Sequence, residues 1–194
     1  MKKKYDWDVY YEHHKERPVK ESLYRTLDLF KKDKIYSGHA FDLGCGNGHE
    51  TRELLRKGWS VTATDKNKKV KIMLDDLKTK HKNNLDIQAV SFEKITWKKT
   101  TFIYANYSLP FCPANHFDKV WINIVDSLRR NGRFSGQFFG DRDEWDLVRH
   151  TKDQALERLE GMEIELFEEI EKDDKTTTGE MKHWHVFDII AKKL

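Results

Sequence analysis

Residues 41–48, Phe-Asp-Leu-Gly-Cys-Gly-Asn-Gly, decide the fold of this chain. An apolar run reaches an acidic residue and then turns through three alternating glycines, Gly44, Gly46 and Gly48. Glycine adopts φ > 0 easily and lets a ligand approach the backbone closely, so it suits such a turn. The stretch therefore predicts a parallel strand whose C-terminal end opens into the floor of a small-molecule site.

A second acidic residue indicates what kind of molecule binds there. Residues 49–57 have the pattern of a helix that ends at Gly58, and the β-rich run 59–64 leads directly to Asp65. A carboxylate about 20 residues beyond the glycine turn, at the end of the next parallel strand, is typical of sites that bind a ribose diol. Its two oxygens can accept both hydroxyl protons. The unit thus predicts a ligand that contains a nucleoside.

The turn does not match the fingerprint of dinucleotide-binding proteins. That fingerprint is G-x-G-x-x-G, and counted from Gly44 its third glycine falls on His49. A β-carbon at this position obstructs the close packing of the helix onto the strand. A nicotinamide oxidoreductase is therefore a disfavoured alternative.

The segment Asp42-Leu43-Gly44-Cys45-Gly46-Asn47-Gly48 resembles the first motif of the class I S-adenosylmethionine-dependent methyltransferases. The resemblance implies that the glycine turn packs against the methionyl tail of S-adenosylmethionine and that Asp65 holds its ribose. The chain looks most like the compact group that includes tellurite and thiopurine methyltransferases.

The rest of the chain alternates between helix and strand patterns. Apolar residues with helical spacing occupy residues 19–30, 70–77 and 117–128, and a capping box at 151–154 opens a further helix to Leu159. Residues 129–132 are expected to close the third of these helices. Strand-like runs cover residues 85–90, 102–105, 133–139, 162–170 and 183–191, and the last two flank a polar linker over 171–180.

This order of elements predicts an α/β fold. A terminal hairpin after strand–helix alternation differs from the two symmetric halves that bind dinucleotides. It resembles the Rossmann-like, seven-stranded methyltransferase sheet, which is mostly parallel, has helices on both faces and ends in an antiparallel hairpin whose last strand lies beside the fifth. Because the sequence shows no repeat or second core, residues 1–194 are expected to form a single domain, with residues 1–18 as an extended, lid-like segment.

The composition excludes some classes of binding partner and cellular location. Thirty-six basic and 33 acidic side chains give a net charge of +3, too small to indicate a polyanionic partner, so nucleic acid is disfavoured. A long apolar stretch and a signal-peptide pattern are both lacking in the sequence, which predicts a cytoplasmic protein without a membrane association. The two cysteines, Cys45 and Cys112, favour reduced small residues over a redox pair. Whether the protein is a monomer or a dimer stays open.

Candidate cofactor residues follow from the rule that open α/β sheets bind ligands beyond the C-terminal ends of their strands. The candidates at strand ends are Asp42, Gly44, Cys45, Gly46, Asp65, Lys66, Ser91, Phe92 and Asn106. In the resembling family, the loop after the third strand flanks adenine, and here that loop contains Ser91 and Phe92. Phe92 offers an apolar plane for stacking, although an ordinary core position explains this residue equally well. From the aromatic lead-in we add Tyr11, since that segment often forms a lid, although its rings can equally pack against the domain.

Candidate catalytic residues are Tyr107, Arg142 and His183. Tyr107 follows the fourth strand, in the segment that faces the methyl group in resembling enzymes. That segment is Asn-Tyr-Ser-Leu, and its departure from the Asn/Asp-Pro-Pro-aromatic run of nucleic-acid amino-methyltransferases argues against methylation of a base amine. Arg142 follows the fifth strand, although a charged loop that neutralises itself explains it equally well. His183 and His185 alternate on one strand face, but without an identifiable third ligand we assign no metal.

These observations favour an S-adenosylmethionine-dependent methyltransferase that acts on a small-molecule acceptor by in-line transfer. A general base is required only if the acceptor keeps its proton at neutral pH. Two alternatives stay open: a non-catalytic module that binds the cofactor or a protein partner, and an RNA methyltransferase.

Overall fold

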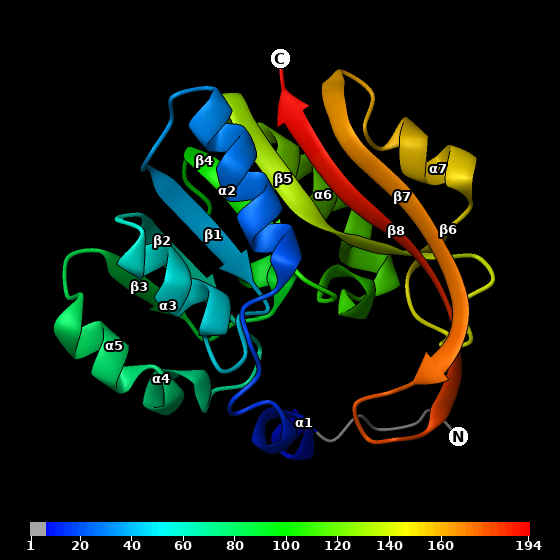
Figure 1. The fold of residues 1–194 in the computed structure, drawn as a ribbon, viewed down its shortest axis with the longest axis horizontal. Coiled ribbons are helices and arrows are strands. Elements are labelled where there is room, and N and C mark those ends of the chain that lie inside the picture. The colour runs from blue at the N-terminus through cyan, green and yellow to red at the C-terminus, as the bar shows by residue number, and fades with distance from the viewer. Residues whose placement is uncertain (1–6) are drawn as a thin grey trace.

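Eight strands form one mixed sheet within residues 7–194, the part of the chain that the computed structural model describes (Figure 1). The strands are β1 His39–Leu43, β2 Ser60–Thr64, β3 Leu85–Gln88, β4 Thr100–Ala105, β5 Leu128–Gly140, β6 Arg149–His150, β7 Met162–Lys175 and β8 Met181–Lys193. Their order is β3-β2-β1-β4-β5-β8-β7, and the two-residue β6 pairs with the end of β5. The first five strands run parallel, whereas β8 lies antiparallel between β5 and β7. The predicted Rossmann-like methyltransferase sheet is confirmed.

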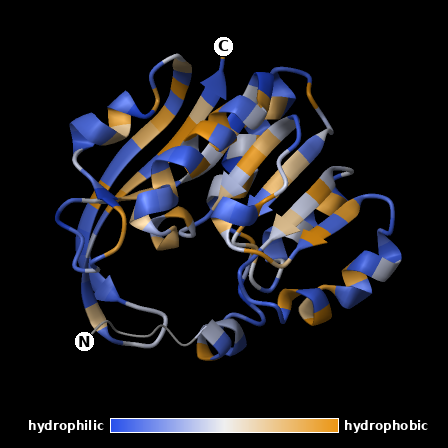
Figure 2. Ribbon diagram, turned by 180° about the vertical axis from the view of Figure 1, so that it is seen from behind, coloured by the Kyte–Doolittle hydropathy of each residue, from blue (hydrophilic) through white to orange (hydrophobic). Residues whose placement is uncertain are grey.

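Helices cover both faces of this sheet. They are α1 Trp7–His13, α2 Glu21–Lys32, α3 His49–Arg56, α4 Val70–Met73, α5 Asp75–Lys80, α6 Ala114–Ser127 and α7 Lys152–Glu157, with short 3-10 helices at Phe92–Lys94 and Leu109–Phe111. Leu23, Phe30 and Leu54 of α2 and α3 pack on one face, and Phe117 and Ile124 of α6 pack on the other. Figure 2 shows hydrophobic residues concentrated in the central strands that these helices sandwich.

The two apolar layers follow from the alternation of side chains along each strand. In β1, Ala40 belongs to the cluster beneath α2 and α3, whereas Phe41 and Leu43 belong to the cluster beneath α6. Since a central parallel strand is buried on both faces, its sequence is a nearly continuous run of apolar residues. Among the described residues, no helix is long and apolar enough to cross a bilayer.

Three expectations about elements were wrong. The lead-in is helical over Trp7–His13 rather than extended, and its residues 1–6 lie outside the described part. The helix expected over 70–77 is broken at Leu74, which is fully buried between α4 and α5. Half of the expected linker 171–180 is strand, because β7 and β8 pair in register up to Lys175 and Met181.

The junction between α6 and β5 also differs from expectation. Residues 129–132 belong to β5, which begins at Leu128, directly after the helix ends at Ser127. A shift of register between Thr100 and Phe102 on β4 accommodates the irregular start of β5, where Asn131 has φ = 63°.

Candidate active site

The turn between β1 and α3 is fixed to both neighbouring strands. The Gly44 and Cys45 N–H groups donate to the carbonyl oxygen of Thr64 at 2.8 and 2.9 Å, at the end of β2. The Ser108 hydroxyl, just past β4, donates to the carbonyl of Leu43 at 2.5 Å. Gly44 has φ = 74°, and a β-carbon there would overlap the side chain of Ser108. The glycine turn is therefore a rigid floor at the C-terminal edge of the sheet.

Asp65 presents its carboxylate beside this floor. The Gly46 N–H donates to its Oδ2 at 3.0 Å, and the Asn67 N–H donates to its Oδ1 at 2.8 Å. The Tyr11 hydroxyl lies 3.2 Å from both oxygens. A carboxylate has about four lone-pair sites, so the two backbone N–H groups orient it and leave two sites for other donors. This geometry suits a ribose diol.

A cavity of about 170 Å³ lies above the turn. All ten residues assigned to a cofactor from the sequence line it: Tyr11, Asp42, Gly44, Cys45, Gly46, Asp65, Lys66, Ser91, Phe92 and Asn106. Phe92 also packs against the α6 core, so its two interpretations are compatible. We call this space the first cavity.

Buried charges surround the first cavity. Burial, with the nearby Glu50 carboxylate as the next cause, raises the pKa of Asp42 to about 7, although the Thr51 hydroxyl donates to it at 2.6 Å. Glu50 accepts two hydrogen bonds from Arg17, both at 2.6 Å, in a pair that is largely shielded from solvent. The lining thus holds three carboxyl groups, of Asp42, Glu50 and Asp65, against the cations of Arg17 and Lys66.

Cys45 contributes a thiol to the same lining. Its side chain is almost fully buried, and burial followed by the Asp42 and Asp65 charges raises its pKa well above the usual value for a thiol. Cys45 and Cys112 are both free.

Helix α1 and the residue that follows it border the first cavity. Trp7, Tyr10, Tyr11 and His14 all line it. The Asn47 side-chain amide donates to the carbonyl of Tyr11 at 2.7 Å, and the ring of Trp7 lies 4.8 Å from that of Phe111. The lead-in therefore lines the cavity and also packs on the glycine turn.

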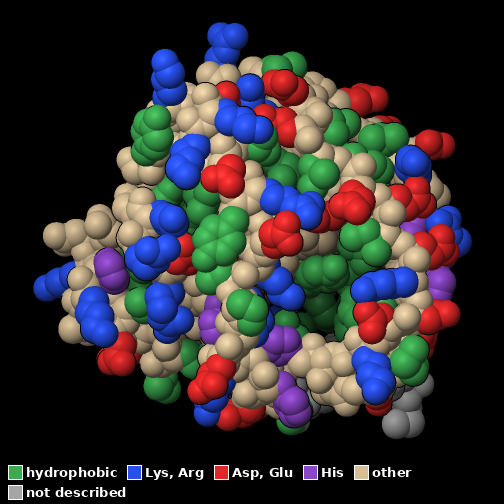
Figure 3. Space-filling model, viewed as in Figure 1, with side chains coloured by type: hydrophobic (Ala, Val, Ile, Leu, Met, Phe, Trp, Pro, Cys, Tyr) green, Lys and Arg blue, Asp and Glu red, His purple; other side chains and the backbone are tan. Residues whose placement is uncertain are grey.

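A second, larger cavity of about 610 Å³ adjoins the first. Six residues line both: Trp7, Tyr10, His14, Asn106, Tyr107 and Phe111. The far wall of the second cavity carries Phe139, Trp145 and Trp184, and the turn between β7 and β8 borders its mouth. Figure 3 shows the hollow, with hydrophobic side chains on its walls.

Tyr107 stands at the boundary between the two cavities in an uncommon backbone conformation. Its φ is 52°, and its N–H donates to Gln137 Oε1 at 2.8 Å, while Gln137 Nε2 donates to Asp188 at 2.7 Å. A non-glycine residue with positive φ is typical of functional sites, where surrounding contacts hold the strain. Burial raises the pKa of the Tyr107 hydroxyl to about 12, so it stays protonated at neutral pH.

The structure places Arg142 and His183 outside both cavities. Trp184 and Val186 of β8 line the second cavity, so His183 lies on the opposite face of the strand. There His183 contacts Asp173 at 2.8 Å, whereas Arg142 pairs with the Glu169 and Glu171 carboxylates at 3.0 and 2.7 Å. The alternative interpretation of Arg142, charge neutralisation on the surface, describes it better, although its main partners come from β7. Within residues 7–194, His, Cys, Asp and Glu form no group of three or more that could hold a metal.

Sequence reasoning missed two features of the second cavity. Trp145 forms part of the far wall, and its position shortly after the fifth strand was the available signal. His14 lines both cavities, and its Nδ1–H donates to the carbonyl of Tyr10 at 2.9 Å. A carbonyl only accepts, so this bond leaves Nε2 of a neutral His14 with its lone pair.

Comparison with protein families gave one match. The family model described as tellurite resistance protein TehB matches residues 10–134. A search of curated proteins gave no match.

Solved structures share the fold at low sequence identity. TehB from Haemophilus influenzae superposes with a TM-score of 0.78 at 16% identity, and the match covers 96% of this chain and 66% of that chain. This chain thus spans about two thirds of that protein. A second structure is the 1,6-didemethyltoxoflavin-N1-methyltransferase of Burkholderia thailandensis with 1,6-didemethyltoxoflavin and S-adenosylhomocysteine bound. It superposes with a TM-score of 0.68 at 17% identity, and the match covers 96% of this chain and 85% of that chain. Magnesium protoporphyrin IX methyltransferase from Synechocystis, with S-adenosylmethionine bound, superposes with a TM-score of 0.69 at 13% identity. The match covers 97% of this chain and 91% of that chain.

Proposed function

The chain belongs to the family of the tellurite resistance protein TehB, and we propose that it is a cytoplasmic, S-adenosylmethionine-dependent methyltransferase with a small-molecule acceptor. The observation that carries this proposal is the joint position of Asp65 and the Gly44–Gly46 turn on one cavity. Asp65 is oriented to accept from a ribose diol, and the turn allows the close approach of a methionyl tail.

Electrostatics support the same ligand. S-adenosylmethionine carries a sulfonium and an ammonium group against one carboxylate, so its net charge is positive. The first cavity holds more carboxyl groups than cations, and Asp42 and Glu50 are the two that are most deeply buried. A cationic ligand relieves the repulsion between these groups.

The adjoining cavities suit methyl transfer between two bound molecules. With the ribose at Asp65 and the methionyl tail at the glycine turn, the methyl group faces the boundary formed by Asn106 and Tyr107. An acceptor in the second cavity then attacks the methyl carbon along the line of the carbon–sulfur bond. The electron pair of that bond goes to sulfur, which leaves S-adenosylhomocysteine. Because the donor is already activated, alignment supplies much of the rate.

Calorimetry of S-adenosylhomocysteine binding tests the cofactor assignment. We expect binding in the micromolar range, weakened at least about tenfold by Asp65→Ala, because hydrogen bonds to a charged group contribute about 1.5–3 kcal/mol each. Asp76→Ala, at an exposed position on α5, is the matched control and should bind normally. Absence of binding by the unmodified protein, or unchanged affinity in Asp65→Ala, contradicts the assignment.

Turnover separates an enzyme from a binding module. Incubation with methyl-labelled S-adenosylmethionine and a cell extract should label a small molecule. Label that appears in RNA instead would favour the RNA methyltransferase, and binding without any transfer would favour the non-catalytic alternative.

A further inference from the structure

The walls of the second cavity form a continuous arc of aromatic rings. Trp7 lies 4.8 Å from Phe111, Phe111 lies 6.1 Å from Trp145, and Trp145 lies 5.3 Å from Trp184, measured between ring centroids. Tyr107 closes the arc at 6.1 Å from Trp184. These rings come from α1, from the segment after β4, from the loop after β5 and from β8. Four distant segments of the chain thus converge to build one aromatic surface.

A buried ion pair behind the far wall holds three rings in place. Lys182 donates to Asp143 at 2.6 Å, and both side chains are inaccessible to solvent. The Lys182 ammonium lies 3.5 Å from the ring centroid of Trp184, 4.5 Å from that of Trp145 and 4.9 Å from that of Phe139. Asp143 also accepts from the N–H of Trp145 at 2.9 Å.

This arrangement keeps the cation away from the cavity. Lys182 does not line the second cavity, whereas the three rings that it contacts do. Its charge is matched by Asp143, so the far wall offers ring surfaces rather than a site for an anion. Charged residues appear at the mouth, where both signs occur and Lys172 is paired with Asp174 at 2.6 Å.

From these observations we propose that the second cavity binds a flat aromatic or heteroaromatic acceptor, stacked against the arc of rings, rather than a small inorganic oxyanion. The proposal rests on the proposed function, because it names the acceptor of the same methyl transfer. Rings prefer to stack on or against the edges of other rings, and such contacts add about 0.5–1.5 kcal/mol beyond the burial of apolar area. A volume of about 610 Å³ falls within the range for organic ligands, whereas an oxyanion of a few atoms would leave most of it to water.

The reacting atom of this acceptor meets the methyl group at the shared boundary. If that atom is a hydroxyl, thiol or ring N–H, its new bond to the methyl carbon forms as the carbon–sulfur bond breaks, and its proton must leave. His14 lines both cavities, and because Nδ1–H is bound to the Tyr10 carbonyl, Nε2 carries the lone pair, which lies 3.5 Å from the Thr177 hydroxyl. Nε2 of His14 therefore takes the proton, and S-adenosylhomocysteine is the second product.

Tryptophan fluorescence and a labelled-methyl assay test the acceptor class. We expect 8-hydroxyquinoline and 2-mercaptobenzimidazole to quench tryptophan emission and to accept label, and we expect tellurite and selenite to do neither. Trp145→Leu should weaken the binding of the aromatic probes at least about fivefold, since it removes one ring of the arc. Trp97→Leu is the matched control, because Trp97 lies outside both cavities and packs on Phe41.

Failure of the acceptor proposal can be distinguished from failure of the methyltransferase assignment. S-adenosylhomocysteine binding, measured on the same samples, reports on the first cavity, and its retention in Trp145→Leu shows that the variant is folded. If the cofactor product binds but neither aromatic probe does, the acceptor class is wrong and the methyltransferase assignment stands. Methylation of tellurite or selenite at a rate unaffected by Trp145→Leu would also contradict the proposal of an aromatic acceptor.

Discussion

Asp42 changes its protonation state near neutral pH, because burial raises the pKa of its carboxyl group. Its carboxyl group is fully enclosed, and its pKa is raised to about 7 from an ordinary value of 3.8. The folded protein therefore retains a proton that the unfolded chain has lost over this pH range. Stability attributable to this group is greatest below about pH 4 and falls as the pH rises to about 7.

The same group makes cofactor binding depend on pH. The ammonium group of S-adenosylhomocysteine, bound with its tail at the glycine turn beside Asp42, favours the carboxylate and lowers its pKa, so binding releases a proton. We expect affinity for S-adenosylhomocysteine to rise about tenfold between pH 6 and pH 8, as the carboxyl group changes from mostly protonated to mostly ionised. Calorimetry in buffers of different ionisation enthalpy measures both the affinity and the released proton. Asp42→Asn should flatten the profile, and a flat profile in the unmodified protein would contradict the prediction.

Among the elements, α1 has the most direct control over the first cavity. Its Tyr11 hydroxyl lies against both oxygens of Asp65, where the ribose hydroxyls of the proposed cofactor would bind. With two lone-pair sites already taken by backbone N–H groups, Asp65 has too few sites for Tyr11 and a diol together. Tyr11 must therefore turn away for the ribose to make both bonds.

This competition is open to a direct test. Tyr11→Phe removes the hydroxyl and should tighten binding of S-adenosylhomocysteine several-fold, because the hydrogen bond that the ligand displaces is no longer present. Tyr36→Phe, at a residue that is 66% exposed, provides the control and should bind as the unmodified protein does. Titration calorimetry measures the difference. Weaker binding in Tyr11→Phe would mean that the hydroxyl contacts the cofactor instead of competing with it.

At the scale of the whole molecule, Arg133 links segments that are far apart in the chain. It lies on β5 and is almost fully buried, and it donates to Asp33 after α2 at 2.7 Å and to Glu165 on β7 at 2.6 and 2.7 Å. The early helix layer and the terminal hairpin are thereby tied through one guanidinium. Without Arg133, the mostly buried Glu165 would lose this partner, whereas the partly exposed Asp33 would keep Lys192 at 3.6 Å.

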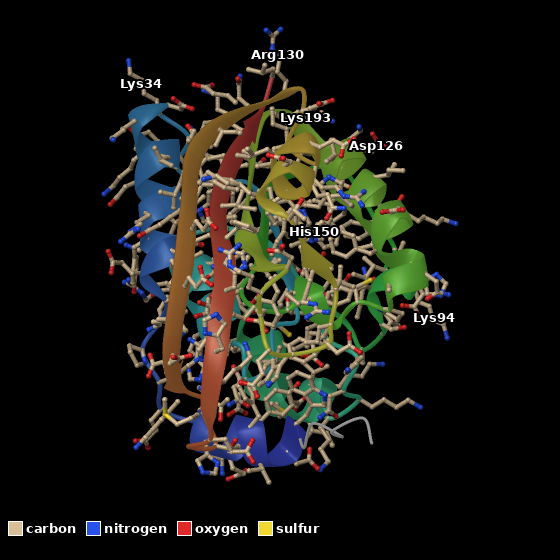
Figure 4. The ribbon with its side chains drawn as sticks, turned by 90° about the vertical axis from the view of Figure 1, so that its right-hand side faces the viewer. Lys34, Lys94, Asp126, Arg130, His150 and Lys193 are labelled. Carbon is tan, nitrogen blue, oxygen red and sulfur yellow. The ribbon has the colours of Figure 1, made fainter. Side chains whose placement is uncertain are left out.

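Arg133→Met should lower the free energy of unfolding by about 1–3 kcal/mol, as measured by urea denaturation. Arg130→Met serves as the control, since Figure 4 shows Arg130 projecting into solvent at the end of the molecule. Affinity for S-adenosylhomocysteine should be unchanged in folded Arg133→Met, because Arg133 does not line the first cavity. A change of less than about 1 kcal/mol would mean that the link contributes little.

The sequence predicted the parts of the site that depend on local spacing. The glycine turn and Asp65 belong to one strand–helix–strand unit, where the order of residues along the chain determines the position of each strand end. The terminal hairpin was recognisable for the same reason, as two β-rich runs at the end of the chain. In contrast, the face on which His183 lies depends on how β8 pairs with β5 and β7, and that pairing has no signature in the residues around it.

The lead-in shows a pattern that was present but misinterpreted. Trp7, Tyr10, Tyr11 and His14 recur at i, i+3, i+4 and i+7, which is the spacing of one helix face. All four line the first cavity. The meeting of Trp145 with Trp184 lay beyond such reasoning, because these residues are far apart in the chain and their contact depends on the loop after β5 folding onto β8.

In the proposed enzyme, the protonated state of Cys45 would protect the protein from methylation by S-adenosylmethionine. In the proposed enzyme a sulfonium, which alkylates sulfur nucleophiles readily, would occupy the cavity that this thiol lines. The thiolate is the reactive form of cysteine, and burial beside two carboxyl groups keeps the thiolate scarce. Under the proposed function, the small residue at the tight turn would thus stay unreactive, and the methyl group would go to the acceptor instead of inactivating the protein.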